Sequence, residues 1–271
     1  MSNWKKVLQA AAGAGGGEPF ATVGYTYEFY SQGPSFTQAS SEPLSFLLGG
    51  DHPDGRDFVQ AGDLIVIITH IGDFNTNRAV SYTGYTQALG LYLNASGDGY
   101  NSNVYIHYKI ADGTETQIDQ PYLSGASSQF VAGVFSGAAA AGAIFGSTVN
   151  YGTITSQWTN SGTSATFLGP ALSGGSYSGD SYIMYASGYS TSSARDSLSY
   201  TSTDPRLNGT FSNIPEADQT DPSNISTAFG CTQLETSETD LTFSATTYNP
   251  LQQPTITIGT NFALAFRIPK A

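Results

Sequence analysis

The sequence predicts an all-β protein: an antiparallel β-sandwich of jelly-roll type with an extended N-terminal arm. Short apolar runs alternate with turns rich in Gly, Ser, Asn and Asp, as in strands joined by tight loops. Amphipathic helical periodicity is almost absent. Only 11% of the residues are charged, against about 25% in an average globular protein, so the polar surface is mainly hydroxyl and amide groups. Together these observations favour two packed layers of antiparallel strands.

The apolar pattern places the strands along the chain. Residues 63–70 (DLIVIITH) form a continuous β-branched run, which predicts a strand buried on both faces. Residues 103–110 (NVYIHYKI) alternate, with Val104, Ile106, Tyr108 and Ile110 on one face. The remaining expected strands are 21–30, 87–93, 130–135, 182–186, 227–233, 240–246 and 255–267, with weaker alternation in 150–167 and a short apolar piece at 45–48. We expect residues 137–142 (GAAAAG) to form a helical turn or a small-residue loop, and 190–224 to be mostly long loops.

The first nineteen residues differ from the body and are expected to form a docking arm with a Gly-rich tether, followed by one domain over 20–271. The apolar run at 7–12 is too short for the core of a signal peptide, so we expect no signal peptide. The tract GAGGG is followed by Glu-Pro rather than Lys-Ser/Thr, which argues against a phosphate loop. The residues expected to dock are Trp4, Lys5, Lys6, Val7 and Leu8.

Composition excludes several classes of partner. The formal net charge of −12 argues against nucleic-acid binding, which needs clustered Lys and Arg. No apolar stretch reaches the roughly 18–20 residues of a membrane-spanning helix, so no membrane insertion is expected. Cys231 is the only cysteine, so no intrachain disulfide forms, and we expect an inert, partly buried thiol.

No residue pattern predicts a catalytic or metal site, and we expect no cofactor. Asp51, Asp54 and Asp57 surround His52 in GGDHPDGRD, where an ordinary solvated turn is favoured over a Ca²⁺ site. The three histidines lack helical zinc-ligand spacing, and no Gly-x-Ser-x-Gly elbow occurs. Glycosidases use a pair of carboxylates, so two acidic clusters leave open the hypothesis that the protein is a polysaccharide hydrolase. They contain Glu216, Asp218 and Asp221, and Glu235, Glu238 and Asp240.

Aromatic residues are abundant, with 17 Tyr, 15 Phe and 2 Trp. Several tyrosines fall in or beside turns and Ser/Gly-rich segments, where they suit interfaces or stacking on sugars. The alternative, which we weigh equally, is that these tyrosines cap the ends of strands in the sandwich. The candidates for glycan or interface contacts are Tyr82, Tyr85, Tyr100 and Tyr189.

Four segments in the middle of the chain follow a recurring order: AGDLIVIITHIGDF, SYTGYTQAL, NVYIHYKIADGTETQI and SQFVAGVFSGA. This order resembles a β-sandwich module of phage virion proteins, in which a GDLVVV strand precedes a GWT turn, a YR-ADG-ET hairpin and an A-V-FRG strand. Tyr85 stands where the family has Trp, and Ser136 stands where it has Arg. The leader is also similar to the N-termini of structural proteins from marine and cyanobacterial phages.

The resemblance implies a non-enzymatic virion component. Within that class we expect tail or tail-fibre association, with capsid decoration on the head surface as the alternative. The implied partners are other virion proteins, bound through the N-terminal arm, and further copies of the chain, with a trimer favoured. A module that recognises host glycan is the second hypothesis, and the two functions can coexist.

Overall fold

A computed structural model describes somewhat more than half of the chain, and most of that part is antiparallel β-structure. The described residues are 21–31, 40–43, 56, 58–74, 77–94, 100–121, 123, 126–145, 151–157, 164–168, 172–173, 181–191, 198–199, 212–214, 224–234, 240–241, 244–248 and 258–271. Every strand pair among them is antiparallel. The expectation of an all-β, antiparallel protein is confirmed.

The first sheet is built from the N-terminal half of the chain and has the strand order β1-β7-β3-β5-β4. Its strands are β1 (Ala21–Ser31), β3 (Leu64–Phe74), β4 (Thr86–Leu93), β5 (Tyr100–Ile110) and β7 (Ser127–Ser136). The central strand β3 pairs with β5 on one side and with β7 on the other. Each residue from Leu64 to Ile71 is at most 1% exposed, which confirms that this run is buried on both faces.

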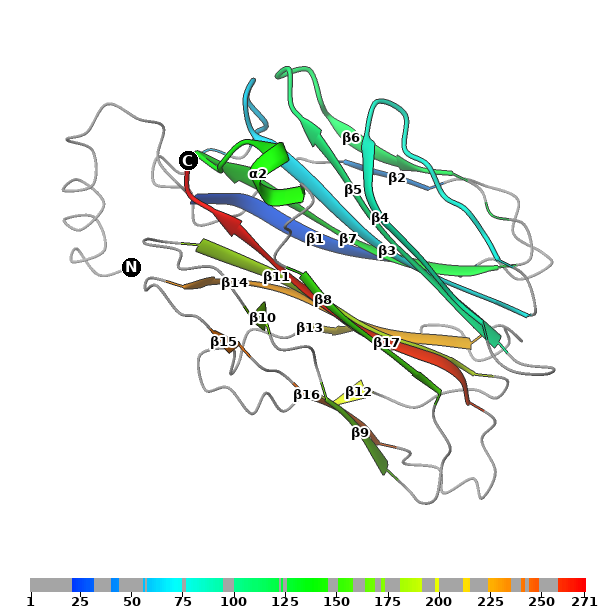
Figure 1. Ribbon diagram of the computed structural model, residues 1–271. Helices are drawn as coiled ribbons and strands as arrows, with labels where there is room; N and C mark the ends of the chain where they lie inside the picture. The colour runs from blue at the N-terminus through cyan, green and yellow to red at the C-terminus, as the bar shows by residue number, and fades with distance from the viewer. Residues whose placement is uncertain are drawn as a thin grey trace.

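The second sheet comes from the C-terminal half, with the order β13-β14-β11-β17-β8 (Figure 1). Its strands are β8 (Tyr151–Gln157), β11 (Ser181–Thr191), β13 (Ser212–Ile214), β14 (Asn224–Leu234) and β17 (Ile258–Pro269). Smaller sheets pair β2 (Ser40–Pro43) with β6 (Gln117–Gln120), β10 (Leu172–Ser173) with β15 (Asp240–Leu241), and β16 (Ser244–Tyr248) with both β9 (Ser164–Leu168) and β12 (Leu198–Ser199). Sequence patterns missed β2, β6, β10, β12 and β13, which are too short for a period to emerge, whereas β15 lies within the expected strand 240–246.

The two five-stranded sheets face each other across one apolar core. From the first sheet, Val66, Ile68 and Ile106 point into this core, and from the second, Met184 and Phe266 do so. Figure 1 shows the two sheets stacked, with β4 and β8 at the same side of the stack. The alternation in β5 is confirmed for Val104, Ile106 and Tyr108, whereas Ile110 at the strand end is 47% exposed.

The short helix α2 (Ala141–Phe145) closes part of the core. It begins near the end of the predicted small-residue segment, and its Ile144 is fully buried. Phe145 stacks on Tyr108 with ring centroids 4.6 Å apart and also contacts Phe266. One turn of helix therefore links the ends of strands from both sheets.

The outer face of the first sheet carries a second apolar core. Ile65, Ile67 and Val134 form its floor. Its cover comes from connecting segments and from the short strand β6, and includes Val59, Val80, Tyr82, Ala111, Ile118 and Ala126, of which Ile118 lies in β6. This cover explains why β3 is buried on both faces.

Candidate functional site

The four segments that carry the resemblance meet at one end of the first sheet. The strands β3 and β4 begin there, and the strands β5 and β7 end there, as the pairs Leu64↔Ile110, Leu64↔Phe135 and Thr86↔Tyr108 show. We call this region the motif end. It contains residues 61–63, 84–86, 111–115 and 135–137.

A buried ion pair fixes the entry to β3 at the motif end. Arg56 Nη1 and Nη2 donate to Asp63 Oδ2 and Oδ1, both over 2.8 Å, and the two side chains are 4% and 5% exposed. Asp63 also accepts from the backbone N–H of Gln60 at 2.8 Å, and Arg56 donates to the carbonyl of Phe58 at 2.9 Å. Parallel two-point bonding of this kind holds both partners in one orientation.

The hairpin after β5 is held by two carboxylates. Glu115 accepts the backbone N–H groups of Asp112 and Gly113, both at 3.0 Å, and its Oε1 lies 2.8 Å from Lys109 Nζ. Asp112 accepts the backbone N–H of Thr114 at 2.9 Å. Burial by itself raises the pKa of Glu115, but Lys109 and the backbone donors outweigh it, so the net pKa is lowered. Glu115 is therefore an ionised clamp at neutral pH.

The hairpin and the entry to β3 are joined through their backbones. Ala111 N–H donates to the carbonyl of Asp63 at 2.8 Å, and Gly62 N–H donates to the carbonyl of Ala111 at 2.9 Å. Gly113 has φ +90°, and a Cβ on it would lie 3.1 Å from the backbone nitrogen of Ala61. The Asp-Gly pair is thus required by a left-handed turn and by close approach of two backbones.

Beside the motif end lies an aromatic cluster formed by Tyr82, Tyr85, Tyr105 and His107. Tyr82 is 4% exposed, and its hydroxyl shares a hydrogen bond of 2.8 Å with Thr69 Oγ1. Tyr82 is therefore a core residue, and the prediction that it contacts a glycan or a partner is wrong. Its ring centroid lies 6.0 Å from that of Tyr85 and 5.1 Å from that of His107.

Two polar atoms in this cluster are buried without a hydrogen-bond partner: Tyr85 Oη and His107 Nδ1. Burial raises the pKa of Tyr85, and Glu115 and Asp119 raise it further. Burial lowers the pKa of His107 to about 4, although a hydrogen bond to the backbone of Val80 opposes the shift. Both groups are therefore neutral at pH 7.

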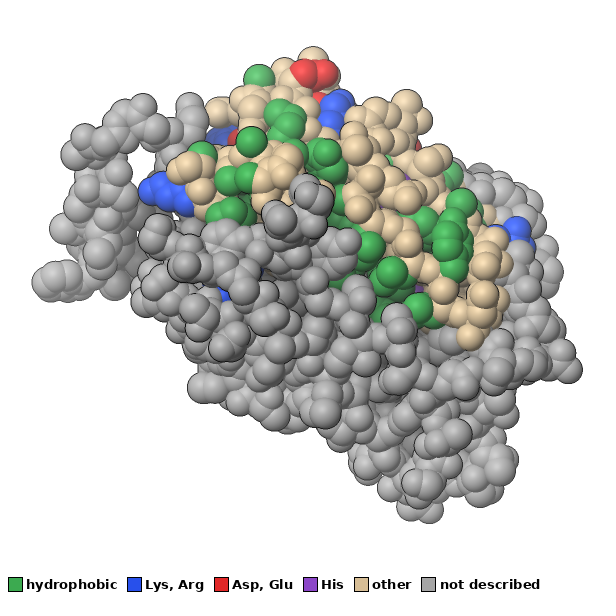
Figure 2. Space-filling view, viewed as in Figure 1, with side chains coloured by type: hydrophobic (Ala, Val, Ile, Leu, Met, Phe, Trp, Pro, Cys, Tyr) green, Lys and Arg blue, Asp and Glu red, His purple; other side chains and the backbone are tan. Residues whose placement is uncertain are grey.

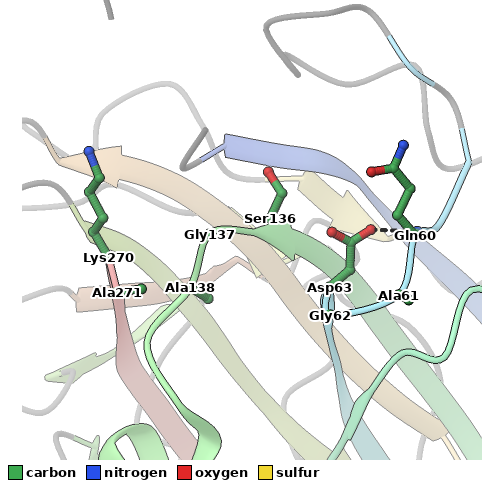
Figure 3. Close-up of a pocket in the computed structure, with 9 residues that line it drawn as sticks. All are labelled: Gln60, Ala61, Gly62, Asp63, Ser136, Gly137, Ala138, Lys270 and Ala271. Atoms are coloured by element: carbon green, nitrogen blue, oxygen red, sulfur yellow. Dashed lines mark hydrogen bonds between the residues drawn. The ribbon is translucent and has the colours of Figure 1, made fainter. Parts of the chain in front are cut away.

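A cavity of about 330 Å³ opens at the motif end, between the start of β3 and the end of β7. Its lining includes Gln60, Asp63, Ser136 and Lys270, with glycines of positive φ at 62 and 137. In Figure 3 the side chains of Gln60, Ser136 and Lys270 project to the same side of the segments that carry them. The Asp63 carboxylate is already bonded to Arg56 and to Gln60 N–H, so the cavity offers the amide of Gln60 and the ammonium of Lys270.

Several candidates from the sequence lie outside the described residues. These are Trp4, Lys5, Lys6, Val7, Leu8, Asp51, His52, Asp54, Asp57, Glu216, Asp218, Asp221, Glu235 and Glu238. Tyr100 begins β5 and Tyr189 lies in β11, but only their backbones are described. Among the described residues, no three His, Cys, Asp or Glu side chains come together as a metal site.

Sequence reasoning missed Arg56, Ser136 and Lys270. Arg56 is one of only 9 basic residues in the chain. It lies seven positions before Asp63, the acidic residue just before β3, and this nearby pair of opposite charges could have been noticed in the sequence. Ser136 and Lys270 share a cavity only because β7 ends beside the end of β17, where Ala138 bridges to Lys270. That proximity leaves no trace in local sequence.

No helix in the described part of the chain is long and apolar enough to cross a membrane. No protein-family model, curated protein or solved structure matches this chain.

Proposed function

We propose that the chain is a non-enzymatic structural protein of a bacteriophage virion, associated with the tail or tail fibre. In this proposal the two facing sheets form a jelly-roll-like β-sandwich over residues 20–271. Residues 1–19 form the arm that attaches this body to another virion protein. Further copies of the chain are the other expected partners.

The observation that carries the proposal is the convergence of the four resembling segments at the motif end. Two of the segments are bonded directly to each other: Ala111 N–H donates to the carbonyl of Asp63, beside the ion pairs Asp63–Arg56 and Glu115–Lys109. The other two segments join them through the strand pairs Thr86↔Tyr108 and Leu64↔Phe135. The four segments thus form one connected unit, as expected if they share an ancestry with a structural module. The apolar core between the two sheets supports the sandwich arrangement.

The test is assembly with and without the arm in particles of the virus that encodes the chain. Deletion of residues 2–17 is expected to leave a folded body, checked by far-UV circular dichroism, that is missing from purified particles. Trp4→Ala is expected to lower the copy number, because a buried Trp anchor supplies about 2 kcal/mol or more of binding energy. Replacement of GAGGG (13–17) by five serines keeps a flexible tether and is the matched control, expected to incorporate normally.

Normal incorporation of the truncated body overturns attachment through the arm. A particle map with the protein on the head surface replaces the tail assignment by the capsid-decoration alternative. Absence of the chain from the particles overturns the virion assignment itself.

A glycan-binding role is the second candidate, and the cavity at the motif end is the observation that favours it. Its Gln60 amide and Lys270 ammonium groups suit the hydroxyls of a sugar. Binding on a glycan array, lost in Lys270→Met and in Gln60→Ala, supports this role. Binding that survives both substitutions places the sugar elsewhere, and the absence of binding to any glycan removes the role.

A further inference from the structure

The turn after β5 contains Asp112 followed by Gly113, a dipeptide with its own chemistry. Aspartate isomerises most readily before glycine, because glycine has no side chain to hinder attack by its backbone nitrogen. That nitrogen loses its proton and attacks Cγ of the protonated Asp112 carboxyl, and water leaves as a five-membered succinimide closes. Water then opens the ring at either carbonyl, which returns aspartate or gives isoaspartate, with no oxidant or reductant involved.

The turn lies at the surface, where water reaches it. Asp112, Gly113 and Thr114 are all exposed. In Figure 2 acidic and basic side chains lie close together at the top of the molecule, where Figure 1 places the connection between β5 and β6. Burial therefore does not protect the dipeptide, so protection has to come from the hydrogen bonds and the backbone geometry of the turn.

The nitrogen that attacks in this reaction is held by a carboxylate. Gly113 N–H donates to Glu115 Oε2 at 3.0 Å, and Asp112 N–H donates to Glu115 Oε1 at 3.0 Å. Lys109 Nζ, 2.8 Å from Oε1, favours the ionised form of Glu115. Removal of the Gly113 proton would break a charge-assisted hydrogen bond and set a negative nitrogen beside a negative carboxylate. Glu115 therefore opposes the first step.

The carboxyl that is attacked is held as an anion. Asp112 Oδ1 accepts the Thr114 hydroxyl and also the backbone N–H of Thr114, the latter at 2.9 Å. The hydroxyl bond and the backbone bond together lower the pKa of Asp112. An ionised carboxylate cannot release water in this reaction, so the reactive protonated form is scarce at neutral pH.

Ring closure also needs the main chain to rotate at Asp112, and contacts on both sides resist this rotation. Before it, Ala111 donates to the carbonyl of Asp63 at 2.8 Å and accepts from Gly62 N–H at 2.9 Å. After it, Gly113 approaches Ala61 so closely that a Cβ would lie 3.1 Å from the Ala61 nitrogen. Isoaspartate adds one carbon to the main chain between these contacts, so its formation would displace one of them.

We propose that Asp112 is a latent site of isoaspartate formation, and that Glu115 keeps it closed by holding the proton of the Gly113 nitrogen. Thr114 adds to the protection by holding the Asp112 carboxylate. Glu115 then has a role that its contribution to stability does not measure, because it sets the chemical lifetime of the hairpin. Conversion at Asp112 would loosen the join between the hairpin and the entry to β3.

The proposal is tested by ageing the full chain at pH 7, below its unfolding temperature. Peptide mapping measures isoaspartate, which has the mass of aspartate but elutes separately. The rate at Asp112 in concentrated guanidinium chloride gives the unprotected reference, and the Asp-Gly pairs at 54–55 and 98–99 check detection in the same digest. Native wild type is expected to convert at Asp112 about tenfold more slowly than the denatured chain, or slower still. Glu115→Gln is expected to raise the native rate about tenfold, the value of one hydrogen bond to a charged group.

Two further variants separate the bonds of Glu115 from general loosening of the turn. Lys109→Met is the matched control, because it removes the cation but leaves Glu115 bonded to both N–H groups, and it is expected to age like the wild type. Thr114→Val removes only the hydroxyl bond to Asp112 and is expected to raise the rate by a smaller factor. Circular dichroism checks that each variant is folded before ageing.

Conversion in native wild type as fast as in the denatured chain overturns the proposal. If Glu115→Gln ages like the wild type, or Lys109→Met ages as fast as Glu115→Gln, the role of the Glu115 bonds is overturned. An unchanged rate in Thr114→Val overturns the part assigned to Thr114, and this variant keeps the test decisive if Glu115→Gln does not fold.

Discussion

The imidazole of His70 lies against the ring of Phe262 with centroids 4.7 Å apart, and this contact joins β3 of the first sheet to β17 of the second. His70 is fully buried, and its Nε2 lies 3.1 Å from Ser102 Oγ. A histidine in the layer between two sheets is well suited to packing while it is neutral. Protonation would place a charge in that layer.

The first prediction is loss of stability in acid. Burial lowers the pKa of His70 to about 3 and that of His107 to about 4, from 6.5 in the unfolded chain. The unfolded state therefore takes up protons first as the pH falls below 6.5, and each histidine costs up to about 1.4 kcal/mol per pH unit down to its folded pKa. Urea denaturation at pH 7 and pH 5 is expected to show this decline, and His70→Gln is expected to reduce it. Histidine pKa values near 6.5 in the folded protein, measured by NMR titration, would contradict this explanation.

The second prediction concerns the buried ion pair. Arg56→Met leaves the Asp63 carboxylate buried without its cation and is expected to cost about 3–5 kcal/mol of unfolding free energy. Adding Asp63→Asn removes the uncompensated charge, so the double variant is expected to regain part of the loss. Chemical denaturation of the wild type, both single variants and the double variant measures the coupling. Strictly additive losses would show that the pair acts as two independent groups.

The third prediction separates backbone strain from steric conflict. Gly113→Ala combines a positive φ with a Cβ only 3.1 Å from Ala61 N, whereas Gly62→Ala has a φ of +95° and no atom within 4 Å. We expect a loss of about 1–2 kcal/mol at Gly62 and a larger loss at Gly113. Gly142→Ala in α2 meets open space and is expected to lose nothing, since alanine favours helix. Melting temperatures of the three variants rank these effects. Equal losses for Gly62→Ala and Gly113→Ala would show that the contact with Ala61 adds no cost to the backbone strain.

The fourth prediction concerns the carboxylate clamp. Glu115→Gln loses the ion pair with Lys109 and part of the bonding to two backbone N–H groups, and is expected to cost about 1 kcal/mol at neutral pH. The folded pKa of Glu115 is lowered, so its contribution is present above the ordinary value of 4.5 and is lost as the pH falls through the folded pKa. The difference between variant and wild type is therefore expected to shrink in acid. Asp119→Asn in the same hairpin region is the control, and a pH-independent difference would contradict the assignment.

The sequence predicted the strands with strong patterns and missed features fixed by distant contacts. The apolar run before His70 could be assigned to a strand because an unbroken row of β-branched residues favours a strand buried on both faces. What covers its outer face could not be assigned, because Val59, Val80 and Ile118 come from segments without a period of their own. The bulge at Ala88 was also invisible, since a one-residue shift depends on the neighbouring strand.

At the candidate site, the Asp-Gly turn was recognisable because only glycine adopts its backbone conformation easily. Tyr82 was proposed for contacts outside the fold, yet its hydroxyl finds Thr69 thirteen residues away and its ring is buried. Turn-flanking tyrosines look alike in sequence whether they point inward or outward. Burial depends on which segment folds over them, and that is a tertiary property.

The order of strands in the second sheet has a consequence for synthesis on the ribosome. All five strands of the first sheet lie within residues 21–136, whereas β17, which sits between β11 and β8, spans residues 258–269. Until β17 has left the exit tunnel, β8 has no partner in its sheet, and Val66, Ile68 and Ile106 lack the side chains of Phe262, Leu264 and Phe266. The nascent chain thus exposes this apolar face of the first sheet during more than half of its translation. The newly made protein is expected to depend on chaperones more than its final stability suggests.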